Sequence, residues 1–173
     1  LYTYDEIYLI GNPPYKGSKL QTNDQKSDFK AYFANEEYSK NLDYIAIWFI
    51  KGARYIADTK AQLAFVTTNS VSQGEHVGIM FPKLLDEGIE IRFVYTSFKW
   101  QNSARDNAGV TVAIISLRNK SRDNKYVYAD GIKNAAKNIN AYLVDTDNSV
   151  IVHKSSKPIS AVPIMNFGSM AID

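Results

Sequence analysis

The stretch "DEIYLIGNPPY", residues 5–15, joins an apolar run to two prolines. The run at 5–11 is rich in β-prone apolar residues, which predicts a buried strand. Proline donates no hydrogen bond to a sheet, so the two prolines mark the point where this strand ends. Asn12 therefore lies at the carboxyl end of a strand, and the stiff exit fixes the direction of the Asn12 and Tyr15 side chains.

The segments that follow alternate between helical and strand patterns. Helices are expected at 43–58 and in the segment that opens near Ser72, and β-rich apolar runs occupy 62–69, 89–98 and 109–118. Strands joined through helices run parallel by right-handed crossovers, so the first three strands should be parallel. No helix separates the last two, which should pair antiparallel. The expected fold class is α/β.

The helices carry more detailed expectations. In 43–58 the core stripe includes Trp48. A short helix near 27–35, capped by Ser27, is expected in the polar connection 16–42. Ser72 and Glu75 have capping-box spacing at the start of the next helix, which Pro82 should kink or divide.

Composition bounds the chain to one domain with a full core, since 173 residues are 45% hydrophobic. The net charge of +2 does not by itself indicate nucleic-acid binding. There is no cysteine, no apolar run long enough to span a membrane and no signal peptide, which favours the cytoplasm. His76, expected at the surface, and His153 have no ligand spacing, so no metal site is expected.

The chemistry of "NPPY" follows from its oxygens. The Asn12 side chain and the Pro13 carbonyl are two acceptors side by side, which match the two N–H bonds of a primary amine or amide. Tyr15 offers a flat ring for stacking on a planar substrate. Positioning and electrostatics would then lower the barrier without a group of shifted pKa. A plain structural turn is the alternative.

"GNPPY" resembles the catalytic motif of S-adenosylmethionine-dependent methyltransferases that act on amino groups. Those acting on adenine N6 in DNA flip the base out of the duplex, and protein-glutamine methyltransferases carry the motif too. The likeness extends to single-chain type II restriction–modification enzymes of the IIL or IIG kind. The segments that resemble theirs are "DYIAIWFIKGARYI", "AFVTTNSVSQGEHV" and "FKWQNSARDNAGVTVAIISL".

The resemblance implies a Rossmann-like methyltransferase fold, of which this chain is the catalytic half. It implies that Asn12 and the Pro13 carbonyl hold the adenine amino group. Pro14 would fix the turn, and Tyr15 would stack on the flipped adenine of double-stranded DNA. The predicted function is methyl transfer from S-adenosylmethionine to adenine N6. The alternatives are a protein-glutamine N-methyltransferase and a non-catalytic DNA-binding module.

Further substrate-binding residues are expected in two loops. In the family a second aromatic closes on the flipped base from the loop between the last two strands, and both Phe98 and Trp100 fall there. Lys16, Lys19 and Arg105 are candidates for phosphate contacts. A solvated loop is the alternative for these three basic residues.

The resemblance also divides the chain. Residues 1–120 are expected to form the catalytic half, and 121–173 the connection to a target-recognition region. The glycine-rich turn that would bind the cofactor is missing, since all nine glycines are isolated and no G-x-G occurs. We expect the cofactor-binding elements upstream of this segment, and we expect the isolated segment to be inactive.

Overall fold

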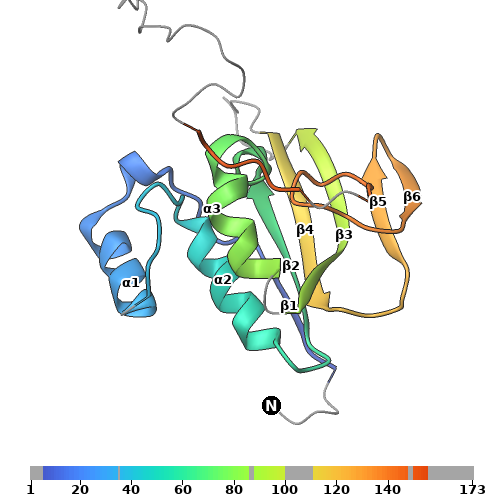
Figure 1. Ribbon diagram of the computed structural model, residues 1–173, viewed down its shortest axis with the longest axis horizontal. Coiled ribbons are helices and arrows are strands. Elements are labelled where there is room, and N and C mark those ends of the chain that lie inside the picture. The colour runs from blue at the N-terminus through green and yellow to red at the C-terminus, as the bar shows by residue number, and fades with distance from the viewer. Residues whose placement is uncertain (1–5, 35, 86–87, 100–110, 148–149, 156–173) are drawn as a thin grey trace, which may run out of the picture.

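The computed structural model describes residues 6–34, 36–85, 88–99, 111–147 and 150–155. These residues form a six-stranded mixed sheet of order β1-β2-β4-β3-β5-β6 (Figure 1). Its strands are β1 (Tyr8–Gly11), β2 (Gln62–Thr68), β3 (Ile89–Lys99), β4 (Thr111–Asn119), β5 (Lys125–Ala129) and β6 (Ile132–Ala136). The helical elements are α1 (Asn23–Phe33), α2 (Ile45–Ile56), α3 (Gly74–Leu85) and the 3-10 turns η1 (Ser18–Leu20) and η2 (Asn69–Ser72).

The strand directions confirm the predicted α/β fold. β1 and β2 pair parallel, and β4 pairs antiparallel with both β2 and β3. β3 therefore runs in the same direction as β1 and β2. The antiparallel strand β4 lies between β2 and β3, where its Leu117 pairs with Leu63 on one side and Ile91 on the other.

The core lies between the sheet and the helices α2 and α3, which cover one of its faces (Figure 1). Along β2, burial alternates strictly, with Leu63, Phe65 and Thr67 buried. β4 is buried along most of its length, as expected for a strand with neighbours on both sides. Fully burying a side chain such as leucine or phenylalanine contributes roughly 1.5–3 kcal/mol to the free energy of folding.

Residues after 120 continue the same sheet. β5 pairs parallel with β3, and β6 closes an antiparallel hairpin with β5. The segment after β6 returns to the core, where Ile139, Ala141 and Leu143 are buried. The division into 1–120 and 121–173 remains a prediction.

Two helix starts differ from the sequence expectation. α1 is capped by Thr22, in a reciprocal capping box with Gln25, and not by Ser27. Ser72 instead donates to the Asn69 carbonyl within η2 at 3.0 Å, so it does not cap α3. α3 also continues through Pro82 without being divided.

Trp48 is the clearest error in the predicted core. It lies on α2 but is 42% exposed, whereas Ile45, Phe49 and Ile56 are fully buried. Trp48 and Tyr55, which is 46% exposed, lie on the side of α2 that its neighbours leave open. None of the described helices is long and apolar enough to cross a membrane.

Candidate functional site

The motif begins where β1 ends. Asn12, Pro14 and Tyr15 are exposed, whereas Pro13 is buried. In the part of the chain that the structure describes, neither the Asn12 side chain nor the Pro13 carbonyl has a hydrogen-bond partner. Both acceptors therefore remain available to a ligand.

A groove of about 490 Å³ lies in front of these acceptors, between β1 and α2. Asn12, Pro13 and Pro14 line it together with Trp48 and Tyr55, residues that are 42% and 46% exposed. Tyr15 is 37% exposed but is not among the residues that line this groove. The structure thus brings three of the four predicted motif residues to one cavity.

Backbone hydrogen bonds hold the loop after the motif. The Tyr44 N–H donates to the Lys16 carbonyl at 2.8 Å, and the Ser18 N–H donates to Asp43 Oδ1 at 2.9 Å. Both partners precede α2, so the start of that helix fixes the chain three residues beyond Tyr15. The motif is consequently anchored on both sides, by β1 before it and by α2 after it.

Asp43 is a site residue that the sequence reasoning did not identify. Its Oδ2 atom lies 3.2 Å from Nε2 of His76, which is only 17% exposed and not a surface residue as expected. Ser70 Oγ lies 3.5 Å from the same oxygen. Burial raises the pKa of Asp43, but the hydrogen bond and charge of His76 and the Ser18 N–H outweigh it, so the pKa lies below its ordinary value.

Asp43 connects the motif loop to α3, because His76 belongs to that helix. The other ring nitrogen of His76, Nδ1, is buried without a partner among the described residues. The sequence gives only a weak signal that Asp43 pairs with His76, because an Asp directly before an apolar helix is common at helix starts. No described group of three or more His, Cys, Asp or Glu side chains is arranged to hold a metal ion.

The second predicted aromatic is not placed at the groove. Phe98 is half-buried near the end of β3, where it pairs with Val112. In the sheet, β3 is the third strand away from β1, so the two strands lie roughly 14 Å apart at the usual spacing between neighbouring strands. Trp100 and Arg105 lie outside the described residues.

The predicted basic contacts are on the surface. Lys16 and Lys19 are exposed directly after the motif, and neither lines the groove. Lys51 of α2 does line it. The site therefore combines two free acceptors, an apolar wall and nearby cations, an arrangement that suits a flat, amino-bearing ligand with negative charge at some distance.

Three comparisons with known proteins all find DNA methyltransferases or restriction–modification enzymes. Residues 2–129 match the family described as "MmeI, DNA-methyltransferase domain". The chain is 45% identical to DNA methyltransferase A of Bacillus subtilis (strain 168) over 170 residues, which cover 98% of this chain and 19% of that protein. It also resembles the solved structure of the type IIL restriction–modification enzyme MmeI in complex with DNA, with a TM-score of 0.82 and 39% identity.

That likeness covers 91% of this chain and 22% of the MmeI chain. The chain thus spans about a fifth of the length of these two relatives. The family match covers more than half of the chain and includes Asn12, the groove and the whole sheet up to β5. The chain belongs to the MmeI DNA-methyltransferase domain family.

Proposed function

We propose that this chain is the catalytic half of a DNA methyltransferase that methylates adenine N6 within a longer cytoplasmic restriction–modification enzyme. One observation carries the proposal. The Asn12 side-chain oxygen and the Pro13 carbonyl, at the carboxyl end of β1, have no partner among the described residues and line an open groove. Ligands of open α/β sheets bind beyond the carboxyl ends of strands.

The two oxygens would each accept one N–H of the adenine amino group. This grip turns the nitrogen lone pair out of the ring plane and toward an electrophile. As the nitrogen attacks, it becomes more positive, and both acceptors then bind it more strongly than in the ground state. Tyr15 would stack on the flipped base, a contact that contributes roughly 1–3 kcal/mol.

S-adenosylmethionine would supply the electrophilic methyl group. The residues of this chain do not by themselves fit that cofactor, because all nine glycines are isolated and no glycine-rich turn follows a strand. The chain spans about a fifth of its relatives, so we assign the cofactor-binding elements to the rest of the full-length protein. The role of this chain is to bind and orient the base.

The test is Asn12→Ala in the full-length protein. Because one of two acceptors is lost, we expect methyl transfer to fall by about 10²–10³-fold, the scale seen for single preorganised hydrogen-bonding groups. Incorporation of labelled methyl groups into target DNA measures this. The matched control is Asn134→Ala, an exposed asparagine on β6, which should keep full activity.

The chemical identity of the product decides between candidate functions. Mass spectrometry of digested DNA should show N6-methyladenine in wild-type reactions. Methylated glutamine in protein, with unmodified DNA, would instead assign the chain to the protein-glutamine methyltransferases. Wild-type activity of Asn12→Ala would remove the role given to its side chain.

A further inference from the structure

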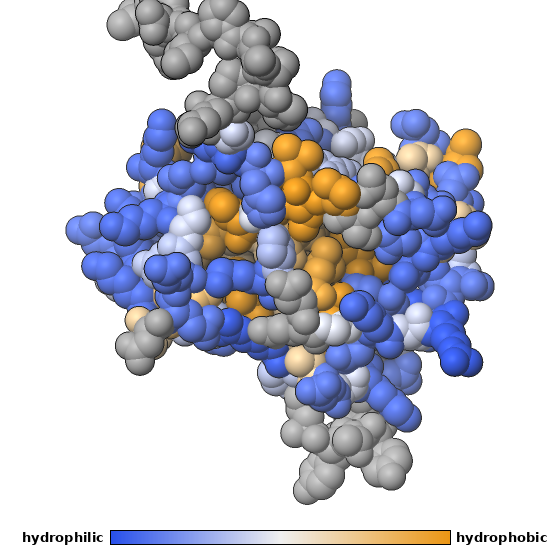
Figure 2. All heavy atoms as spheres, viewed as in Figure 1, coloured by the Kyte–Doolittle hydropathy of each residue, from blue (hydrophilic) through white to orange (hydrophobic). Residues whose placement is uncertain are grey.

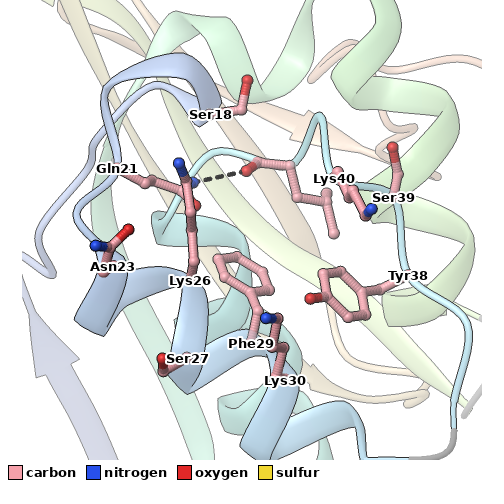
Figure 3. Close-up of a pocket in the computed structure, with 11 residues that line it drawn as sticks. Ser18, Gln21, Asn23, Lys26, Ser27, Phe29, Lys30, Tyr38, Ser39 and Lys40 are labelled. Carbon is pink, nitrogen blue, oxygen red and sulfur yellow. Dashed lines mark hydrogen bonds between the residues drawn. The ribbon is translucent and has the colours of Figure 1, made fainter.

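A second cavity, lined by none of the residues of the groove, begins at Ser18, three residues after Tyr15. It has a volume of about 530 Å³ and opens between α1 and the segment that leads to α2 (Figure 3). Lys26 and Lys30 extend from α1, and Lys40 approaches from the connecting segment (Figure 3). We call it the lysine pocket. Figure 2 shows that the α1 side of the molecule, on the left, is predominantly hydrophilic.

The lysine pocket is positive because three lysines line it and no carboxylate of the described residues does. None of its three lysines forms an ion pair within the part of the chain that the structure describes. The acidic residue of α1 nearest to them in sequence, Asp28, faces another way and accepts a hydrogen bond from the Tyr44 hydroxyl at 2.5 Å. Within the described part of the chain, three lysines without an ion pair therefore line one cavity.

The walls of the lysine pocket are rigid. Phe29 is 2% exposed and stacks on Tyr38 with ring centroids 5.5 Å apart. The Gln21 side chain donates to the buried Leu42 carbonyl at 2.8 Å and joins the two walls (Figure 3). Ser27 and Ser39 add hydroxyl donors at the rim. A cavity with fixed walls, ammonium groups and hydroxyls suits an oxyanion such as a phosphodiester.

The position of the lysine pocket identifies the phosphate it would bind. Ser18 lines the pocket and follows Tyr15 by three residues, a span of at most about 10 Å. Along the axis of a DNA duplex that distance corresponds to about three nucleotides, at a rise of ~3.4 Å each. We propose that the lysine pocket binds a backbone phosphate of the DNA strand that carries the target base, within three nucleotides of that base.

This inference rests on the proposed function for the choice of DNA as ligand and for the placement of the target base beside Tyr15. The test uses the full-length protein with Lys26→Gln, Lys30→Gln, Lys40→Gln and the double variant of the first two. Glutamine keeps the aliphatic stem and removes the charge. The dissociation constant of a target duplex is measured over a range of salt concentrations.

The logarithm of the binding constant falls as the logarithm of the salt concentration rises. Replacing a lysine that contacts a phosphate should make this slope shallower by about one. At 0.15 M salt this corresponds to roughly fivefold weaker binding per contact. The matched control is Lys120→Gln, which removes an exposed charge at the far end of β4 and should change neither value. Unchanged binding in the double variant, or an equal loss in the control, would overturn the proposal.

Two further measurements locate the ligand. Duplexes that carry a neutral methylphosphonate at single positions should show one position, within three nucleotides of the target base, whose effect disappears in the double variant. Free inorganic phosphate should compete only weakly with DNA; a pocket that binds free phosphate as tightly as it binds DNA contradicts a backbone contact. Because these readouts measure binding alone, they hold even if the methylation assay fails.

Discussion

Asn12 and Pro13 present their oxygens outward for a simple local reason. β1 ends at Gly11, so Asn12 has no ladder partner, and proline has no N–H to offer a neighbouring strand. The Pro13 ring is buried and thereby fixes the backbone whose carbonyl remains free. The rigidity and the availability of this pair of acceptors thus have the same origin.

Asp43 is the residue whose removal should separate positioning from direct contact. In Asp43→Asn the side chain loses its charge and one of its two acceptor oxygens, which weakens its contacts with the Ser18 N–H and with His76. We expect the free energy of unfolding to fall by about 1–3 kcal/mol. In the full-length protein, we expect the methylation rate to fall more than DNA affinity. Asn134→Ala, at an exposed asparagine of β6, is a suitable control.

The same carboxylate gives a pH dependence with a definite sign. Its folded pKa lies below the ordinary value, so its stabilisation is present above about pH 3.9. That stabilisation is lost as the pH falls through the lower folded pKa. Acid unfolding of wild type and Asp43→Asn should therefore converge at low pH, and curves that stay parallel would contradict this account.

The sequence predicted individual residues well only where their chemistry is local. The free acceptors of the motif follow from proline and from the end of a strand, so they were predictable. The exposure of Trp48 and the pairing of Asp43 with His76 depend on which elements pack nearby, and helical periodicity carries no such information. The aromatic candidates Phe98 and Trp100 were left open by sequence, and Trp100 lies outside the described residues.

At the scale of elements, α2 packs closely on β2 because Gly52 faces the strand. A Cβ atom at this position would lie 2.7 Å from Leu63 Cδ2 and 3.4 Å from Phe65 Cε2. Gly52→Ala gains up to about 1 kcal/mol of helix propensity, but overpacking costs about 1–3 kcal/mol. We expect net destabilisation, visible as a lower midpoint in urea unfolding.

Gly17→Ala is the matched control for that substitution. Its backbone angles of φ −55° and ψ 143° suit alanine, and the nearest atom to a new Cβ is Asp43 Oδ1 at 3.8 Å. Its midpoint should stay within experimental error of wild type. A Gly52→Ala protein as stable as this control would show that α2 can move away from β2 at little cost.

The types of the elements were predictable from the sequence more reliably than their ends. The strand-and-helix order was right, because long apolar runs and amphipathic stripes are strong signals. The cap of α1 was misplaced by five residues, from Thr22 to Ser27, since several polar residues there satisfy the capping rule. Pro82 was expected to kink or divide α3, but the helix continues through it to Leu85, because few backbone hydrogen bonds remain to be lost near its end.

At the scale of the whole molecule, the chain should not bind the methyl donor tightly on its own. Its glycines are isolated and its described sheet offers no glycine-rich turn at the groove. Isothermal calorimetry of residues 1–173 with S-adenosylmethionine should show no micromolar binding, whereas the full-length protein should bind. Micromolar affinity for the isolated segment would place the cofactor site within this chain.

The insertion of β4 between β2 and β3 has a consequence for the order of assembly. Among the described residues, β3 has no direct pairing with β2, and the β5–β6 hairpin is joined to the sheet through β3. During synthesis, β1 and β2 would emerge with β3 but could not join it before Thr111–Asn119 leaves the ribosome. Until then the strand edges stay open to aggregation, and the late, long-range closure should make this protein a slow folder that benefits from chaperones.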